Sequence, residues 1–174
     1  MMHDNKNISG ARFMILSGLA AELERVLGNW MLEQNVQNGF SQFSVPYIVN
    51  ESAMFNSGQF PKFKNDAFEC GGKFLIPTGE VPLVNVCEGK LYDLDELPVR
   101  FTTLSHCFRK EAGSAGKDTK GLIRLHQFQK VETVSVVSAN KSEEEHQFLL
   151  KNAASLLEKL ELPYRIVDIC SGDI

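Results

Sequence analysis

Charged and aromatic residues occupy every second position of the stretch 124–132, where a buried strand would normally carry aliphatic side chains. The composition of 124–137 predicts a strand, and successive side chains of a strand point to opposite faces. We therefore expect one face to carry Arg124, His126, Phe128, Lys130 and Glu132. A guanidinium group can fork onto a phosphate, an aromatic ring can stack on a purine, and a carboxylate can accept a hydrogen bond from an ammonium group. This face is therefore a candidate ligand site.

A second charged segment, Arg-Lys-Glu at 109–111, follows the β-branched and aromatic run 99–107. This run predicts a second strand, and the first and third residues of the charged segment are expected on one face at its end. The polar, glycine-rich loop 113–117 comes next. It does not match a phosphate-binding P-loop, because Glu111 stands in place of the first glycine and Asp118 follows the lysine. Nucleotide recognition is therefore expected from strand side chains.

Each of these residues also has an ordinary structural explanation. A single arginine, glutamate or phenylalanine on a strand usually makes a cross-strand ion pair or packs in the core. The segment Thr78-Gly79-Glu80 likewise leaves two interpretations open. Thr78 can cap a helix that has Glu80 in its first turn, or the two polar side chains can hold a ligand, and these roles can coexist.

Three elements upstream of the charged segments are expected to position them. Apolar residues at three- and four-residue spacings predict an amphipathic helix that begins near Ser17 and ends at Asn38-Gly39. An extended run, 43–49, follows and contains Pro46, which is tolerated only at a strand edge, a bulge or an irregular contact. Gly71-Gly72 then predicts a tight hairpin. The apolar stripe of the helix consists of Leu16, Leu19, Leu23, Val26, Leu27, Trp30 and Met31.

The C-terminal part of the sequence predicts one helix and one strand. Ser142 and Glu145 have the spacing of a capping box, which would open a helix that ends at about Leu160. Its expected buried stripe is Phe148, Leu149, Leu156, Leu157 and Leu160. The segment Tyr164–Cys170 predicts a buried strand. No repeat or linker interrupts the sequence, so we expect one α+β domain with an antiparallel sheet flanked by helices.

Composition agrees with a folded domain, since the 174 residues are 43% hydrophobic with a net charge of −4. The slight acidity argues against a strongly basic nucleic-acid surface. The sequence has no apolar run of membrane length and no signal-like start, so we expect a cytoplasmic protein without membrane contact. The cysteines and histidines lack the spacing of a metal site or a disulfide framework. We expect reduced thiols in or near the core and no metal ligands in this segment.

The string 108–132 resembles motif 2 of class II aminoacyl-tRNA synthetases, in the form found in seryl-tRNA synthetases. Thr78-Gly79-Glu80 resembles the serine-binding Thr-x-Glu loop of that subgroup. The family usually has alanine at the position of Gly79, a change that we expect to loosen the loop. The helix, glycine and proline of 17–49 resemble motif 1, which forms the homodimer interface in the family, and 50–63 also matches the seryl subgroup.

The resemblance implies a reaction and a role for each site residue. Family members activate L-serine with ATP and Mg²⁺ to form seryl-adenylate, and then transfer the seryl group to tRNA(Ser). Because the serine carboxylate is already a nucleophile at neutral pH, catalysis would consist of positioning and electrostatic stabilisation. Arg109 would be the catalytic contact to the α-phosphate, Glu111 would meet the adenine amino side, and Phe128 would stack on the ring. The ATP-binding set would be Arg109, Lys110, Glu111 and Phe128, and the serine-binding set Thr78, Gly79, Glu80 and Glu132.

The resemblance covers motifs 1 and 2, whereas the tRNA-gripping coiled-coil arm and motif 3 of the family have no counterpart in 1–174. We therefore expect a truncated class II catalytic domain, with motif 1 at about 17–49, the serine loop at 78–80 and motif 2 at about 99–136. The expected function is that of a homodimeric serine–tRNA ligase, with this chain inactive alone and tRNA held mainly by the absent arm. The alternative is a catalytically silent serine- or nucleotide-binding module. A purely structural dimerisation domain is disfavoured because it would not need these site residues.

Overall fold

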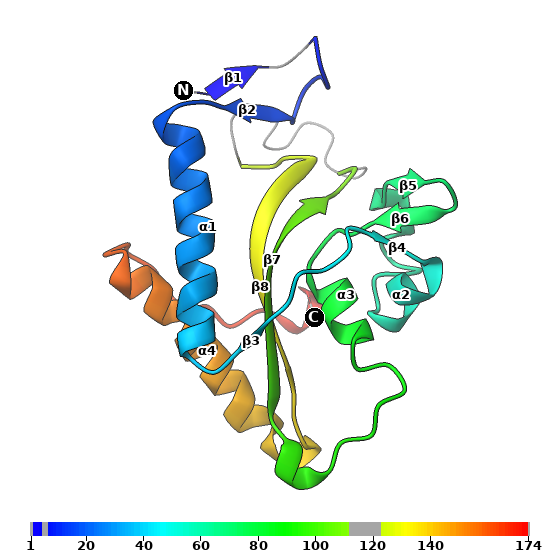
Figure 1. Cartoon of the computed structure of the whole chain (residues 1–174), viewed down its shortest axis with the longest axis vertical. Helices are drawn as coiled ribbons and strands as arrows, with labels where there is room; N and C mark the ends of the chain where they lie inside the picture. The colour runs from blue at the N-terminus through cyan, green and yellow to red at the C-terminus, as the bar shows by residue number, and fades with distance from the viewer. Residues whose placement is uncertain (1, 5–6, 112–122, 174) are drawn as a thin grey trace. The chain divides into compact units, whose positions relative to one another are not determined.

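Figure 1 shows the chain as a computed structural model, which describes residues 2–4, 7–111 and 123–173. The glycine-rich loop 113–117 lies outside the described residues. The chain divides into two compact units, 1–136 and 137–174. The division into units does not test the expected bounds of motif 1, the serine loop and motif 2, which stay predictions.

The first unit is centred on a long antiparallel pair of strands, β7 (Val99–Phe108) and β8 (Gln127–Val136). A short strand, β3 (Ser41–Gln42), pairs with β7 in parallel and makes this sheet mixed. Both long strands were predicted from their composition and are confirmed. Three short elements lie outside this sheet, namely β1 (Met2–Asp4), β2 (Met14–Leu16) and the 3₁₀ turn η2 (Leu94–Glu96).

At the site end β8 begins three residues later than the sequence suggested, at 127 instead of 124, whereas β7 runs one residue further than predicted, to Phe108. Arg124 and His126 precede β8, and Arg109 and Glu111 follow β7, so only part of the expected polar face lies on strands. The reason is that the backbone there bonds elsewhere. The His126 N–H donates to the Arg12 carbonyl at 3.0 Å, and Glu111 has a positive φ of 54°, which no strand residue adopts.

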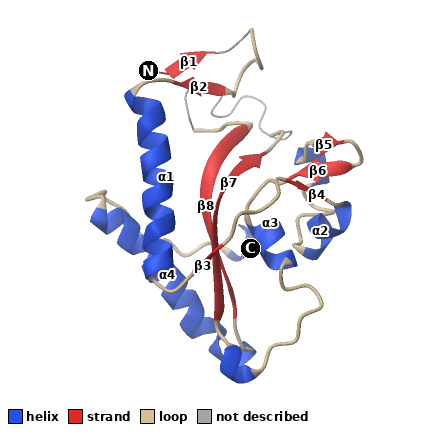
Figure 2. Ribbon diagram, in the orientation of Figure 1, coloured by secondary structure: helices blue, strands red, loops and turns tan. Residues whose placement is uncertain are grey.

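Opposite faces of the β7–β8 pair are covered by different helices (Figure 2). Helix α1 (Leu19–Gln37) confirms the predicted helix and lies against one face, where Gly28 approaches the Leu104 side chain. Asn35 of α1 is buried, and its Nδ2 donates to Thr102 Oγ1 at 3.0 Å. Helix α3 (Glu80–Asn85) begins on the other face.

A second, antiparallel sheet has the order β4 (Ile48–Val49), β6 (Lys73–Leu75) and β5 (Glu69–Cys70). The predicted hairpin is confirmed, because Gly71 and Gly72 both have positive φ, 57° and 77°. Its core includes T-shaped Phe60 and Phe74 rings 4.9 Å apart. The elements beside it are α2 (Glu51–Asn56) and η1 (Lys64–Asp66), and the core cluster is Val49, Met54, Phe60, Ala67, Phe74, Ile76 and Val81.

The predicted extended run 43–49 is confirmed only at its end. Ile48 and Val49 form β4, whereas β3 lies before the run, at 41–42. Pro46 stands between the two strands, and a proline has no N–H to donate to a sheet ladder. The segment around Pro46 is therefore irregular, as predicted, and it connects β3 of one sheet to β4 of the other.

The second unit contains the helix α4 (Ser142–Lys159). The 3₁₀ turn η3 (Ala139–Lys141) precedes this helix, and the 3₁₀ turn η4 (Ser171–Asp173) lies near the C-terminal end of the unit. The helix confirms the prediction, but the capping box is wrong. Ser142 is already inside the helix, and its hydroxyl donates to the Ala139 carbonyl at 3.0 Å instead of accepting from a helix N–H. The expected buried stripe is half-buried, and the fully buried residues of α4 are Glu145 and Asn152.

The predicted buried strand at Tyr164–Cys170 is wrong. The segment has no regular structure and is exposed, with 67% of the Ile169 surface accessible. A strand needs a neighbour to bond its N–H and C=O groups, and no described residue pairs with this segment. An apolar composition alone therefore misled the prediction.

The expected position of the cysteines in or near the core holds for Cys107, which is buried, and in part for Cys87, which is half-buried, whereas Cys70 and Cys170 are exposed. Within the described ranges, no helix is long and apolar enough to cross a membrane. In the same residues no group of three or more His, Cys, Asp or Glu side chains could hold a metal ion.

Candidate functional site

The candidate site forms where the ends of β7 and β8 meet the loop 76–80. The Phe108 N–H donates to the Ile76 carbonyl at 2.9 Å, and the Arg109 N–H donates to the His126 carbonyl at 2.9 Å. The Lys110 N–H donates to the Asp66 carbonyl at 2.8 Å. These backbone hydrogen bonds hold the loop, the charged segment after β7 and the start of β8 in one place.

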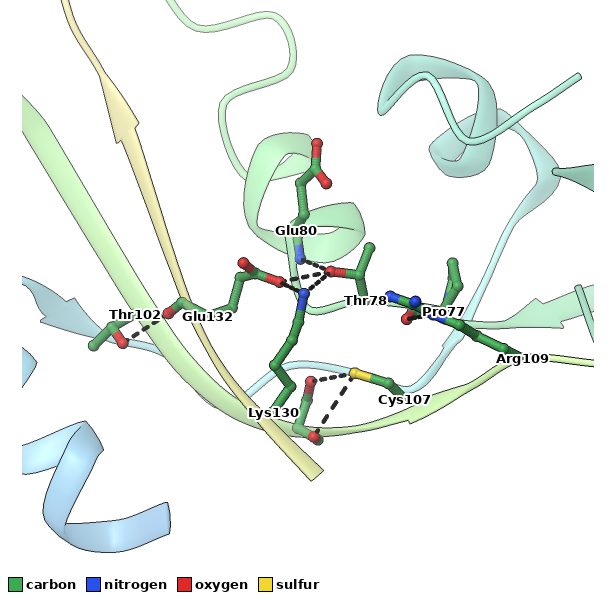
Figure 3. A network of polar contacts seen from close by, with 9 residues as sticks. Pro77, Thr78, Glu80, Thr102, Cys107, Arg109, Lys130 and Glu132 are labelled. Carbon is green, nitrogen blue, oxygen red and sulfur yellow. Dashed lines mark hydrogen bonds and ion pairs between the residues drawn. The ribbon is translucent and has the colours of Figure 1, made fainter. Parts of the chain in front are cut away.

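A closed triangle of polar contacts joins Thr78, Lys130 and Glu132 (Figure 3). Thr78 Oγ1 donates to Glu132 Oε2 at 2.6 Å and accepts from Lys130 Nζ at 2.7 Å. The Lys130 ammonium also lies 2.5 Å from Glu132 Oε2. The sequence placed Lys130 on this face by its period of two, but gave it no role in the site.

Glu80 is the first residue of α3, and its side chain lines a cavity together with Thr78 and Lys130. Burial raises the pKa of its carboxyl above the ordinary value, the negative charge of Glu132 raises it further, and Lys130 opposes the shift. The expectation that Glu80 lies in a first helical turn is confirmed. The cap role of Thr78 is confirmed only in part, because Gly79 occupies the N-cap position, but the Glu80 N–H at the start of the helix donates to Thr78 Oγ1 over a long 3.5 Å.

Gly79 is buried and closely packed against the strands. A Cβ at this position would lie 2.9 Å from Thr103 Cγ2, 3.0 Å from Glu132 Cβ and 3.2 Å from Ser105 Oγ. The first distance is shorter than real Cβ contacts, so only glycine lets the loop lie this close to the sheet. The expectation that Gly79 loosens the loop is therefore wrong for this chain. Its φ is −66°, so the requirement is steric and not conformational.

Arg109 and Phe128 lie together at the other side of the site. The Arg109 Cζ is 5.2 Å from the centroid of the Phe128 ring, and Nε donates to the Pro77 carbonyl at 3.2 Å. Glu111 forms an ion pair with Arg124 at 3.1 Å. The structure thus brings four of the sequence-predicted residues into two neighbouring pairs.

Two other residues of the charged segments point to different surroundings. Lys110 is exposed, and its Nζ lies 5.8 Å from the centroid of the Phe68 ring, away from the Arg109–Phe128 pair. His126 Nδ1 lies 3.0 Å from the Arg109 carbonyl oxygen and thereby supports the turn that carries Arg109.

Two cavities share the Arg109, Glu111 and Arg124 side chains. The larger has a volume of about 460 Å³, within the range of small-molecule sites. The smaller, of about 320 Å³, adds Phe128, Ile123 and Leu125. Together they present the Glu80 carboxylate and Thr78 in the larger cavity, the Arg109 and Arg124 guanidinium groups with the Glu111 carboxylate in the shared part, and the Phe128 ring in the smaller one. The larger cavity is lined by Gln59, Phe63, Asp66, Ala67, Pro77, Thr78, Glu80, Arg109, Glu111, Arg124 and Lys130.

Residues 64–174 match the family model of the tRNA synthetase class II core domain (G, H, P, S and T). The chain therefore belongs to the class II tRNA synthetase core family, and its α+β fold is that of this core. The predicted resemblance to the seryl members is confirmed by sequence. The chain is 49% identical over 168 residues to a serine–tRNA ligase of Mesoplasma florum, a match that covers 96% of this chain and 40% of the relative.

Solved structures give the same result. The seryl-tRNA synthetase of Pyrococcus horikoshii, complexed with ATP, has a TM-score of 0.94 and 36% identity over 98% of this chain and 39% of its own. The cytoplasmic serine–tRNA ligase of Naegleria fowleri, in complex with AMP, has a TM-score of 0.94 and 31% identity over 99% of this chain and 41% of its own. The chain thus spans about 40% of the length of the Mesoplasma relative.

The close packing of Gly79 predicts that Gly79→Ala is destabilising although its backbone conformation suits alanine. Overpacking against Thr103 should cost about 1–3 kcal/mol in the free energy of unfolding, measured by urea denaturation. Thr103→Ser removes the methyl group that obstructs a Cβ and keeps the hydroxyl. The double variant should therefore recover part of the loss.

Gly172→Ala is the matched control for this prediction, because no atom lies within 4 Å of a Cβ at that position. It should leave the free energy of unfolding nearly unchanged. A neutral Gly79→Ala, or a double variant that simply adds the losses of the two single ones, would contradict the steric account.

The raised pKa of Glu80 predicts a pH-dependent stability effect of Glu80→Gln. A raised folded-state pKa favours the folded state only below the unfolded pKa of about 4.3, and this contribution is lost as the pH rises through the folded value. At pH 7 the glutamine variant should therefore be more stable than the wild type. Its advantage should disappear in thermal melts near pH 4.

Glu88→Gln provides the control, because it removes one negative charge at an exposed position after α3. The difference between the two variants across the pH range isolates the effect of burial at Glu80. A pH-independent difference would show that the Glu80 carboxyl is not held in an unfavourable charged state.

Proposed function

We propose that the protein containing this chain is a serine–tRNA ligase, which activates L-serine with ATP and transfers the seryl group to tRNA(Ser). The observation that carries the proposal is the order of groups along the two joined cavities. The Thr78–Glu132 pair and Glu80 suit the ammonium and hydroxyl groups of serine. Arg109 suits a phosphate, and Phe128 beside it suits a stacked purine ring.

In this proposal the residues 78–80, with Glu132, bind serine, and Arg109, Lys110, Glu111 and Phe128 bind ATP. Gly79 takes part through its close approach to the sheet, which sets the position of Thr78. Glu111 contacts the amino side of adenine. For this role its ion pair with Arg124 would have to break, or the carboxylate would have to bind Arg124 and adenine at the same time. Lys110 is the weakest member of the set, because its ammonium lies over Phe68.

The reaction needs no nucleophile from the protein. The serine carboxylate oxygen attacks the α-phosphorus, the new P–O bond forms, and the bond to pyrophosphate breaks. Arg109 would contact the α-phosphate and stabilise the charge that develops on it. Mg²⁺ would be held mainly by the ATP phosphates and by water, with one or two carboxylates from the protein, so it needs no cluster of three ligating side chains, and the described residues contain none.

The complete protein, and not this chain alone, is proposed to perform the reaction. The chain spans about 40% of its Mesoplasma relative. We propose that motif 1 (17–49), the serine loop (78–80) and motif 2 (99–136) belong to one catalytic domain whose motif 3 lies outside this sequence. The net charge of −4 fits a tRNA contact made mainly by an arm that is also outside it. A cytoplasmic location is proposed from the relative of Naegleria fowleri.

We also propose a homodimer with α1 and the Pro46 segment near the two-fold interface. The support is that α1 exposes a row of apolar side chains, which includes Leu19, 82% exposed, Leu23 and Val26. Such a row on a helix usually marks a contact with another protein surface.

The function is tested by amino-acid-dependent exchange of pyrophosphate into ATP with the complete protein. Serine should support exchange far better than alanine, because a site built to bind a hydroxyl leaves buried polar groups unpaired when the hydroxyl is missing. Equal exchange with both amino acids would refute the assignment to serine. Binding of serine or ATP without exchange would instead identify a catalytically silent module.

In the same assay Arg109→Ala should lower the exchange rate by about a hundred-fold, the loss typical of one transition-state charge contact. Lys90→Ala is the control, because it removes an exposed cation from a turn beyond α3. An unchanged rate for Arg109→Ala would assign Arg109 a structural role through Pro77 and Phe128. Exchange by the 174-residue chain at the rate of the complete protein would show that it is sufficient.

The dimer is tested by sedimentation of the complete protein. We expect a dimer at micromolar concentration, and Leu19→Glu with Leu23→Glu should shift it toward monomer by placing charges in an apolar interface. A wild-type monomer under these conditions would contradict the proposal.

A further inference from the structure

The Lys130 ammonium occupies the place that an ammonium-bearing ligand would need. It lies 2.7 Å from Thr78 Oγ1 and 2.5 Å from Glu132 Oε2, at the wall of the larger cavity. These two acceptors are the ones that the proposed function gives to serine. Lys130 therefore stands in the ligand-free protein where the amino group of serine would bind.

Because Thr78 can accept few hydrogen bonds, the Lys130 ammonium and the amino group of a ligand would compete for it. Its hydroxyl proton is donated to Glu132, and its oxygen accepts from Lys130, with the Glu80 N–H facing it at 3.5 Å. A hydroxyl oxygen has two acceptor sites, so a second ammonium group would find no well-directed one. Two ammonium groups held by the one Glu132 carboxylate would also repel each other.

The charges around the site favour exchange of one cation for another. The Glu132 side chain is only 18% exposed, so leaving its carboxylate without a cation would be costly. Glu80 is close enough for the charge of Glu132 to raise its pKa. Two carboxylates thus face one ammonium group. The Lys130 side chain is 35% exposed and flexible, so it can leave while a ligand takes over its contacts.

We propose that Lys130 is a resident cation of the ammonium subsite, which holds Thr78 and Glu132 in their binding positions in the free protein and is displaced by the ligand's amino group. The proposal rests on the proposed function. It makes Lys130 a residue that sets selectivity for ammonium-bearing ligands. After displacement, its charge lies in the cavity that Arg109 also lines, where it meets the anionic part of the ligand.

The test compares two probes, seryl-sulfamoyl-adenosine and its deamino analogue, by calorimetric binding to the complete protein. The ratio of their affinities cancels whatever Lys130 contributes to the shared adenosine part. In Lys130→Met, the preference for the amino probe should rise about ten-fold or more, since one charge-assisted competitor is gone. Lys130→Arg, which keeps a cation, and Lys90→Met, at an exposed position, should retain most of the wild-type ratio.

An unchanged or lowered affinity ratio in Lys130→Met would overturn the proposal about Lys130. The proposed function would still stand in that case, provided that the wild type binds both probes. Binding of neither probe by the wild type would overturn both. If Lys130→Met does not fold, NMR of the lysine ammonium groups in the wild type decides the matter. The Lys130 signal should move with the amino probe and stay with the deamino probe, and an equal response to both would overturn the proposal.

Discussion

The antiparallel register of β7 and β8 is the constraint on which the rest of the structure depends. It pairs Thr103 with Glu132 and Ser105 with Lys130, so four polar side chains share one face of the sheet. On the opposite face, Asn35 of α1 donates to Thr102, whose hydroxyl in turn donates to the Glu132 carbonyl at 2.8 Å. A slip of one residue would reverse both faces and separate Glu132 from Thr78.

The loop 76–80 gains its position from contacts with this register and has no regular structure of its own before α3. Backbone bonds tie Ile76 to Phe108 on one side and to Tyr47 on the other, both at 2.9 Å. Gly79 then allows the loop to descend onto Thr103 and Ser105 without a side chain between them. The hydroxyl of Thr78 reaches Glu132 because both conditions hold.

The positions of the charged side chains determine which end of a ligand each part of the site can bind. The carboxylates of Glu80 and Glu132 lie near Thr78, whereas Arg109 lies beside Phe128 and Arg124 is paired with Glu111 between the two cavities. In the free protein Glu132 pairs with Lys130, Glu111 pairs with Arg124, and Arg109 donates to the Pro77 carbonyl. Such preorganised charges can bind a ligand with opposite charges at its two ends without a large rearrangement. Under the proposed function, a ligand would exchange its own charged groups for these partners.

The sequence by itself determined the features that depend on neighbouring residues. β-Branched composition predicted β7 and β8, the period of two placed Phe128, Lys130 and Glu132 on one face, and Gly71-Gly72 predicted the hairpin. Only the tertiary structure decided that Gly79 must be glycine, that Lys130 pairs with Thr78, and that Tyr164–Cys170 has no strand partner among the described residues. The reason is that these features depend on contacts between residues far apart in the chain. Local periodicity carries no information about which distant segment comes within bonding distance.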